Sequence, residues 1–292
     1  MKTQTPQLYV GTTGWAYPES YPIFYPKKQT KFFDWLRYYS DYFNVVEVNT
    51  TFYQFLKPKN IEDWLTKLND VEDFSFIIKL HQYFTHRRQI THSDIKATQE
   101  VLDILQKSER LAGVLIQFPY SFECSEVNIL YLKVIIDLFI NYPKFIEVRH
   151  PSWKNKKAKT ITFCSVDLPQ VGDSIPFKPS VSNDMSYLRF HGRNKKGWTH
   201  SIKYFRNIEK MDPTIDRYEY YYSTGELLEI SQQIKKETYD KAKKIFVILN
   251  NHPHIDAVSN ALELYSMLNE DHKVKIPKNI LSIYPRLNRI AV

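Results

Sequence analysis

The sequence predicts an α/β protein, an irregular (β/α)8 barrel of the triosephosphate isomerase (TIM) type with parallel strands. Eight short apolar segments alternate with segments of helical periodicity, and this order implies parallel strands joined by right-handed crossovers. A single barrel of this class commonly uses about the length of this chain, which has 292 residues. No linker-like stretch divides the chain, so residues 1–292 are expected to form a single TIM-barrel-like domain.

The eight expected strands are short apolar runs that are rich in β-branched and aromatic residues. They span residues 8–12, 45–50, 74–80, 113–118, 145–149, 162–166, 187–191 and 245–250. Near-continuous apolar runs of this kind are typical of strands that are buried on both faces. A barrel wall between an inner core and outer helices has this property.

Between the strands, apolar residues recur at intervals of three and four. This spacing predicts helices over residues 29–43, around 61–68, over 94–107 and over 125–141. The run Ser223-Thr224-Gly225-Glu226 fits a capping box, in which the hydroxyl and the carboxylate bind the first amides of a helix. We expect that helix to extend to about residue 243, and a last helix to cover about 256–270.

Two places break the regular alternation. After the fifth strand, the basic run at residues 154–159 is too short for a full helix. After the sixth strand, residues 168–186 are rich in proline and serine, which predicts a loop in place of a helix. The expected barrel is therefore irregular on this side, with a short helix after strand five and a loop after strand six.

The composition suits a folded basic protein. Its net charge is +8, its pI is about 9.1 and 43% of its residues are hydrophobic, which suffices for a sizeable core. A basic balance favours acidic partners. The lysine clusters lie in or beside predicted helices, where they are typical of solvated faces, so nucleic acid is the less favoured partner.

Cysteine usage and the apolar runs bear on the compartment. Cys124 and Cys164 are the only cysteines, and neither stands in a pair or a metal-binding spacing, which indicates a reducing compartment. The first six residues contain no apolar signal region, and no stretch approaches the roughly 18–20 apolar residues that span a bilayer. We therefore expect a cytoplasmic protein without a membrane partner.

A series of short motifs runs along the chain in a fixed order. They are Gly11-Thr12-Thr13-Gly14-Trp15, Val46-Glu47-Val48-Asn49-Thr50-Thr51-Phe52-Tyr53, Lys79 with Thr85-His86, Gln117-Phe118-Pro119, Glu147-Val148-Arg149-His150-Pro151-Ser152-Trp153, Asp167, Arg189-Phe190-His191-Gly192-Arg193, Arg217-Tyr218 with Tyr222-Ser223, and Asn250-Asn251-His252. From residue 8 to about 270 this series resembles the YecE-like family of uncharacterised barrel proteins, also described as domain of unknown function 72. The resemblance implies a TIM-barrel-like fold but no reaction, because the family's activity is not established. The segment after Trp153 is shorter than the family pattern, which affects the fifth helix only.

The expected site is the mouth at the carboxyl ends of the strands, where barrels of this class gather reactive groups. Alternation along a strand places residues i and i+2 on the same face, so Glu147 and Arg149 share one face, as do Arg189 and His191. The candidate catalytic residues are Glu47, Glu147, Asp167 and His191. The candidate ligand-binding residues are Trp15, Asn49, Tyr53, Lys79, His86, Gln117, Arg149, His150, Trp153, Arg189, Arg193, Asn250, Asn251 and His252.

The residue types suggest roles within this mouth. Arg149 and Arg189 offer planar forks of donors for an anionic or carboxylate group of a ligand. Glu47 or Glu147 is the expected general base, and His191 the expected proton shuttle. The alternative is a ring of mutually satisfied ion pairs that plugs the barrel, with His191 as a structural residue. A buried ring of that kind is a poor way to gain stability, which favours a functional site.

Three functions remain open on the sequence alone. The favoured one is an enzyme that acts on a small polar or anionic metabolite, of the sugar or sugar-phosphate class, by acid/base chemistry. The alternatives are a nucleic-acid-binding protein with phosphodiester chemistry and a non-catalytic ligand-binding barrel. Glu47, Glu147, Asp167, His191 and His252 are ligand types that a divalent metal takes, but the nearby cations and the absence of a short signature argue against one. No cofactor is predicted.

Overall fold

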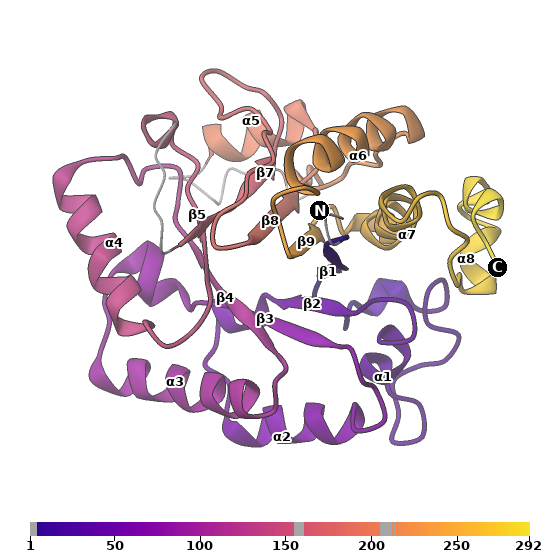
Figure 1. Ribbon diagram of the computed structural model, residues 1–292, viewed down its shortest axis with the longest axis horizontal. Coiled ribbons are helices and arrows are strands. Elements are labelled where there is room, and N and C mark those ends of the chain that lie inside the picture. Colours follow the sequence, from indigo (N-terminus) through magenta and orange to yellow (C-terminus); the bar gives the residue numbers. More distant parts are fainter. Residues whose placement is uncertain (1–4, 155–160, 205–211, 213) are drawn as a thin grey trace.

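A computed structural model describes residues 5–154, 161–204, 212 and 214–292, and it has the architecture of a TIM-like α/β barrel (Figure 1). The strands are β1 (Gln7–Thr13), β2 (Val45–Val48), β3 (Ser75–Lys79), β4 (Leu111–Gln117), β5 (Lys144–Glu147), β6 (Thr162–Phe163), β7 (Ser165–Asp167), β8 (Met185–Phe190) and β9 (Lys244–Leu249). They form one sheet in the order β6-β5-β4-β3-β2-β1-β9-β8-β7, and neighbouring strands pair in parallel. The expected fold class is confirmed.

The ninth strand arises because the predicted sixth strand is interrupted. Cys164 separates β6 from β7, so that one predicted segment contributes two short strands. β6 pairs with β5, whereas β7 pairs with β8. The two edges of the sheet are therefore consecutive in the chain, and the sheet curls into a nearly closed cylinder.

Helices surround this sheet (Figure 1). They are α1 (Trp35–Tyr39), α2 (Pro58–Lys67), α3 (His92–Lys107), α4 (Glu126–Leu138), α5 (Lys195–Lys203), α6 (Thr224–Thr238), α7 (Asp256–Leu268) and α8 (Lys278–Leu281). The predicted capping box is present at α6, where Ser223 Oγ accepts from the Glu226 amide and the Glu226 carboxylate accepts from the Ser223 amide. Within the described ranges, none of the helices has the length and apolar character needed to cross a membrane.

The first helix is shorter than the predicted span of residues 29–43. Asp34 caps α1 by accepting hydrogen bonds from the Leu36 and Arg37 amides. Upstream, the Gln29 side chain accepts from the Trp35 amide and the Thr30 hydroxyl accepts from the Phe33 amide. Polar side chains that bind nearby backbone amides compete with helix formation, which explains why the apolar periodicity overestimated this helix.

On the irregular side of the barrel, the structure confirms part of what the sequence predicts. Residues 168–184 contain no helix, as the prolines and serines predicted, whereas residues 155–160 of the expected short helix lie outside the described part of the chain. α5 was not predicted. It is short, contains Gly197, and begins where Asn194 Oδ1 accepts a hydrogen bond from the Gly197 amide.

The interior of the barrel has an apolar layer below and a polar layer above. Inward side chains of the lower layer include Phe145 on β5 and Tyr187 on β8, whose rings stack 4.3 Å apart between centroids. Two residues further along the same strands, the inward positions are Glu147 and Arg189, both fully buried. Because the side-chain period of a strand is two, the charged layer lies directly on the apolar one, toward the carboxyl ends.

Gly11 of β1 permits the close pairing of β1 with β2, and we predict that Gly11→Ala strongly destabilises the barrel. A Cβ atom at this position would lie 1.9 Å from the Val45 carbonyl oxygen, which is part of the β2 backbone and has little room to move. We expect a loss of about 2–4 kcal/mol in the free energy of unfolding, measured by urea denaturation. Gly225→Ala is the control, because nothing lies within 4 Å of that Cβ position in α6. The control should be neutral or stabilising by up to about 1 kcal/mol, and equal losses for both variants would contradict the prediction.

Candidate functional site

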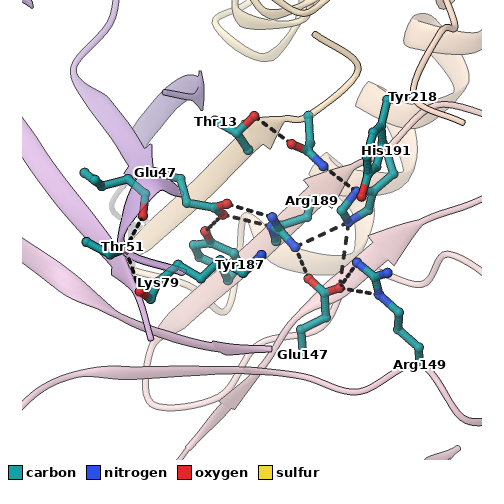
Figure 2. Close-up of polar contacts among 12 residues, drawn as sticks. Thr13, Glu47, Thr51, Lys79, Glu147, Arg149, Tyr187, Arg189, His191 and Tyr218 are labelled. Carbon is teal, nitrogen blue, oxygen red and sulfur yellow. Dashed lines mark hydrogen bonds and ion pairs between the residues drawn. The ribbon is translucent and has the colours of Figure 1, made fainter. Parts of the chain in front are cut away.

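A buried ion-pair network lies on top of the apolar layer and joins three strands that are far apart around the barrel. Arg189 of β8 donates from Nε and Nη2 to the two carboxylate oxygens of Glu47 on β2, at 2.8 and 2.6 Å. Its Nη1 donates to Oε2 of Glu147 on β5. The three side chains are at most 1% exposed. Figure 2 shows the guanidinium between the two carboxylates, so Arg189 bridges the cylinder from wall to wall.

The remaining carboxylate positions are also occupied. Arg149 donates from Nε to Glu147 Oε1 at 2.7 Å, and the Tyr187 hydroxyl donates to Glu47 Oε2 at 2.5 Å. Burial raises the pKa of Glu147, but the positive charges of Arg189 and Arg149 outweigh it and hold that pKa well below its usual value. Glu147 is therefore a carboxylate throughout the physiological range, with its lone pairs directed at guanidinium groups.

His191 lies just beyond β8 and is held as a neutral ring. The Thr13 hydroxyl donates to Asn250 Oδ1 at 2.6 Å, so the Asn250 amide group is left to donate to His191 Nδ1, 2.7 Å away. With Nδ1 as the acceptor, the ring proton is on Nε2, which lies 3.8 Å from Glu147 Oε1 and 3.4 Å from Arg189 Nη1. Burial and the charge of Arg189 lower the pKa of His191 to about 3.

Lys79 ends β3 and differs from the other cations of the mouth. Among the side chains that the structure describes, none accepts a hydrogen bond from its Nζ atom, which instead lies 4.4 Å from the centroid of the Phe52 ring. Burial, reinforced by the charge of Arg189, lowers the pKa of Lys79 to about 7. The Thr51 hydroxyl donates to the Lys79 carbonyl oxygen at 2.6 Å and fixes the end of the strand. A large fraction of this amine is neutral near pH 7.

An open cavity of about 530 Å3, its mouth included, lies above the network at the carboxyl ends of the strands. It is lined by three cations, three amides and five rings: Lys79, Arg149, Arg189, Asn49, Gln117, Asn250, Tyr17, Tyr53, Tyr218, His191 and His252. None of these described lining residues is acidic, because Glu47 and Glu147 lie beneath the arginines. Two lining atoms, Asn49 Oδ1 and His252 Nδ1, are buried and have no hydrogen-bond partner within the described residues.

Aromatic side chains form one side of the cavity. Tyr17 and His252 stack with ring centroids 5.0 Å apart and planes 12° from parallel. Tyr218 lies next to them, 5.7 Å from the His252 ring and 5.8 Å from the His191 ring. Tyr53 is 73% exposed at the rim. Flat rings and amide groups together suit a ligand that carries hydroxyl groups.

Most of the residues singled out in the sequence meet at this mouth. Eight of the candidate ligand-binding residues line the cavity, together with His191: Asn49, Tyr53, Lys79, Gln117, Arg149, Arg189, Asn250 and His252. Four participants were not among the candidate site residues: Thr13, Tyr17, Tyr187 and Tyr218. The strand period could have found Tyr187, because it precedes Arg189 by two residues. Thr13 and Tyr218 stand in the quoted motifs Gly11-Thr12-Thr13-Gly14-Trp15 and Arg217-Tyr218, and those motifs were the available signal for them.

Asp167 and Arg193 form a separate network beside the mouth. Arg193 donates from Nε and Nη2 to the two Asp167 oxygens, each at 2.9 Å, and the Tyr222 hydroxyl donates to Asp167 at 2.5 Å. Neither Asp167 nor Arg193 lines the cavity. The motif residues Tyr222 and Gly192 are also linked here, because the Gly192 amide donates to the Tyr222 hydroxyl at 3.0 Å.

Five further candidate residues lie outside the lining of the cavity: Trp15, His86, His150, Trp153 and Asn251. Trp153 is buried, and its Nε1 donates to a backbone carbonyl oxygen, that of Phe122, at 2.7 Å. His86 packs edge-on against Phe52, and burial together with the charges of Lys79 and Arg149 lowers its pKa to about 4. His86 is therefore close enough to the mouth for the charges of Lys79 and Arg149 to lower its pKa, although it does not line the cavity.

The expected metal-ligand types are not clustered. Across residues 5–154, 161–204, 212 and 214–292, no group of three or more His, Cys, Asp and Glu side chains is arranged to hold a metal ion. The carboxylates concerned are bound to arginine instead: Glu47 and Glu147 to Arg189, and Asp167 to Arg193.

Fold and site together define a TIM-like barrel protein whose carboxyl-end mouth holds a cationic cavity above a buried ion-pair layer. The sequence profile of the family described as "Protein of unknown function DUF72" matches residues 9–281. The chain belongs to this family, which confirms the resemblance seen in its motifs.

Individual relatives agree with this assignment. The UPF0759 protein YunF of Bacillus subtilis (strain 168) is 30% identical over 94% of this chain and 99% of that protein. The UPF0759 protein YecE of Escherichia coli (strain K12) is 26% identical over 53% of each chain. A crystal structure of a DUF72 family protein from Thermotoga maritima MSB8 is similar with a TM-score of 0.75 at 27% identity, covering 90% of this chain and 99% of that one. A DUF72 family protein from Enterococcus faecalis V583 gives 0.74 at 26% identity, covering 93% and 99%.

We predict that Arg189→Met lowers the free energy of unfolding by about 3–5 kcal/mol at pH 7, because two buried carboxylates lose their shared partner. The pKa of Glu147 is depressed in the folded protein, so its contribution to stability is complete above its ordinary value of 4.5 and is lost as pH falls through the lower folded value. The difference in the free energy of unfolding between wild type and variant should therefore become smaller at acidic pH. Arg37→Met is the control, because its partners Asp41 and Asp70 are solvent-exposed, and it should cost less than about 1 kcal/mol. Similar losses for the two variants in urea denaturation would refute the prediction.

The His191 ring provides a second prediction. In nitrogen–proton correlation NMR spectra, we expect a neutral ring protonated on Nε2 that does not titrate between about pH 5 and 8, because its pKa is lowered to about 3. Asn250→Ala removes the donor to Nδ1 and should allow both tautomers. The exposed His254 ring, for which Glu219 is a nearby carboxylate partner, provides the comparison signal of a solvent-accessible histidine. Protonation of His191 near pH 6 would contradict the assignment.

Proposed function

We propose that this protein is an enzyme that acts on a small polar, anionic metabolite by acid/base chemistry in the cavity at the barrel mouth. The observation that carries the proposal is the Lys79 amine, which lines the cavity without an acceptor of its own and has a pKa lowered to about 7. A base works best when its pKa lies near the operating pH. Perturbed groups of this kind in a concave site are typical of active sites.

The charge of the lining supports an anionic ligand. Lys79, Arg149 and Arg189 face the cavity, and the carboxylates that balance the arginines lie below them. The Arg149 side chain is 11% exposed and keeps guanidinium donors on the side away from Glu147. Guanidinium groups suit carboxylates and phosphates. The amides and rings of the lining would bind the hydroxyl groups of a sugar, a sugar phosphate or a hydroxy acid.

The contacts of each residue favour a particular division of roles. Both oxygens of Glu47 and of Glu147 accept from arginine, so these carboxylates are engaged by cations and are suited to positioning Arg149 and Arg189. His191 is neutral with a proton on Nε2, and it would donate a hydrogen bond rather than carry charge. We therefore assign proton abstraction to Lys79, where the sequence alone favoured a glutamate.

Two observations favour a small molecule over nucleic acid. Arg189, at the floor of the cavity, is 1% exposed, so an extended polymer backbone cannot reach its guanidinium. The cavity is a pocket at the barrel mouth with Arg189 in its floor, whereas nucleic acids follow open basic grooves. Cys124 and Cys164 are both free thiols, which suits the reducing cytoplasm as the compartment of the reaction.

The proposal predicts selective binding and proton exchange. In thermal-shift assays with ribose 5-phosphate, glycolate, lactate and neutral ribose, the anions should raise the melting temperature and ribose should not. In deuterated water, at least one bound anion should exchange a C–H proton, as followed by NMR. Arg149→Met should weaken binding, and Lys79→Met should abolish exchange. Exchange unaffected by Lys79→Met would remove the base assignment.

Arg37→Met and Lys59→Met are the matched controls, because both side chains are exposed on the outer helices. Both should bind and exchange like the wild type. A single-stranded oligonucleotide that binds at low salt and is released as salt rises, with no shift from any small anion, would instead favour the nucleic-acid function. Binding of anions without exchange would indicate a non-catalytic ligand-binding barrel.

A further inference from the structure

We propose that Lys79 is a nucleophile that forms an imine with the carbonyl group of its substrate, and that the substrate is therefore an aldehyde or ketone carrying a carboxylate or phosphate. This inference rests on the proposed function, because it concerns the same cavity and the same anionic ligand. Lys79 here acts as a nucleophile in place of a base, and the imine acidifies the C–H bonds next to the former carbonyl carbon, which accounts for the expected exchange. The nitrogen lone pair forms the new C–N bond, and the carbonyl oxygen takes up two protons and leaves as water. Hydrolysis of the imine reverses the step, so no oxidant or reductant is needed.

The network beneath the cavity leaves Lys79 without a counter-ion. Both nearby carboxylates, Glu47 and Glu147, are bound by Arg189 in preference to the lysine. Figure 2 shows the Lys79 side chain running from the end of its strand toward the side of the network formed by Tyr187 and Arg189. A lysine in an ion pair stays protonated, so its nitrogen has no free lone pair and is a poor nucleophile. The arrangement of charges therefore favours the free amine.

A second lysine of the same barrel shows that burial alone does not produce this state. Lys144, at the start of β5, is 8% exposed, and burial also lowers its pKa. Its Nζ donates to three backbone carbonyl oxygens, those of Phe139, Ile140 and Tyr142, at 2.8, 3.2 and 2.7 Å. All three protons of that ammonium group have acceptors. Lys79 lines the cavity instead, and no group in the described part of the chain accepts a hydrogen bond from its Nζ atom.

The groups around Lys79 suit the later steps of imine formation. The Asn49 Oδ1 atom is a buried acceptor without a partner in the described structure, and Asn49 lines the same cavity at the end of β2. It can accept a hydrogen bond from the carbinolamine hydroxyl. Arg149 supplies donors for the anionic arm of the substrate. The substrate therefore needs a carbonyl carbon at Lys79 and a negative group within reach of Arg149.

The first experiment traps the imine by reduction. Wild-type protein is incubated with glyoxylate, pyruvate or dihydroxyacetone phosphate and sodium cyanoborohydride, and the adduct is located by mass spectrometry of peptides. We expect Lys79 to be labelled before any other lysine. Neutral dihydroxyacetone, the matched control for its phosphate, should label Lys79 at least about tenfold more slowly, because only the anion is concentrated by the cationic lining. Equal labelling by the neutral and the phosphorylated ketone, or labelling of surface lysines only, would overturn the proposal.

The dependence on pH adds an independent readout. The titratable and charged groups that face Lys79 are Glu47 on β2, Glu147 at the end of β5 with Arg149 two residues beyond it, Arg189 on β8, and the His86 ring after β3. Since the pKa of Lys79 is lowered to about 7, labelling should rise through neutral pH and level off by about pH 8.5. Labelling of exposed Lys59, whose pKa is raised by its hydrogen bond to Asp63, should still be rising there. Parallel profiles for the two lysines would count against a reactive amine at Lys79.

Variants separate this proposal from the proposed function. Lys79→Arg places a permanent positive charge at this position but cannot form an imine, so it should retain anion binding in thermal-shift assays and lose the label. Lys144→Gln should keep the label at Lys79, even if it is less stable. Bound anions could exchange protons in the wild type and not in Lys79→Met, while none of the three carbonyl compounds forms an adduct. In that case the imine is refuted and the proposed function stands. If no anion binds, both fall.

Discussion

The mouth of this barrel is organised by one constraint, the sharing of a single guanidinium by two buried carboxylates. Glu47 and Glu147 are on strands that the sheet keeps apart, and each would be unstable as an isolated charge in the interior. Arg189 has enough donors in a fixed plane to bind Glu47 with two of them and Glu147 with a third. The positions of β2, β5 and β8 are thereby coupled, and every other polar group of the mouth is arranged around that bridge.

Stability does not explain why the barrel has this layer. The layer below it is apolar, with stacked Phe145 and Tyr187, and apolar side chains could have continued to the strand ends. Replacing a buried ion-pair network by apolar groups is often neutral or stabilising. What the network does achieve is to turn two carboxylates away from the cavity, so that the lining is cationic and the Lys79 amine has no carboxylate to neutralise it. The cost of the layer is thus consistent with a functional mouth.

Sequence patterns predicted the strand segments and their parallel order, apart from the break at Cys164 that divides the sixth segment into β6 and β7. The two-residue period correctly predicted that Glu147 and Arg149 share a face, and that Arg189 and His191 do. The pattern does not specify which residue on one strand meets which residue across the barrel, because that depends on strand tilt and register around the whole cylinder. For this reason the binding of Glu47 by Arg189 was not predictable, although both residues were singled out. Some candidates beyond the strand ends, such as Trp153, lie outside the lining of the cavity, because the chain turns there and the period no longer applies.

The contrast between Lys79 and Lys144 shows how reactivity differs from burial. Both are lysines on barrel strands, and both have pKa values lowered by desolvation. Lys144, at the amino-terminal end, is a structural residue because three carbonyl oxygens satisfy its ammonium group. Lys79, at the carboxyl end, is close to the unpartnered Asn49 Oδ1 in the lining of one cavity. Groups that a folded protein leaves unsatisfied in the same cavity are complementary to something other than the protein itself, and the complement that we propose is an anionic molecule with an electrophilic carbon.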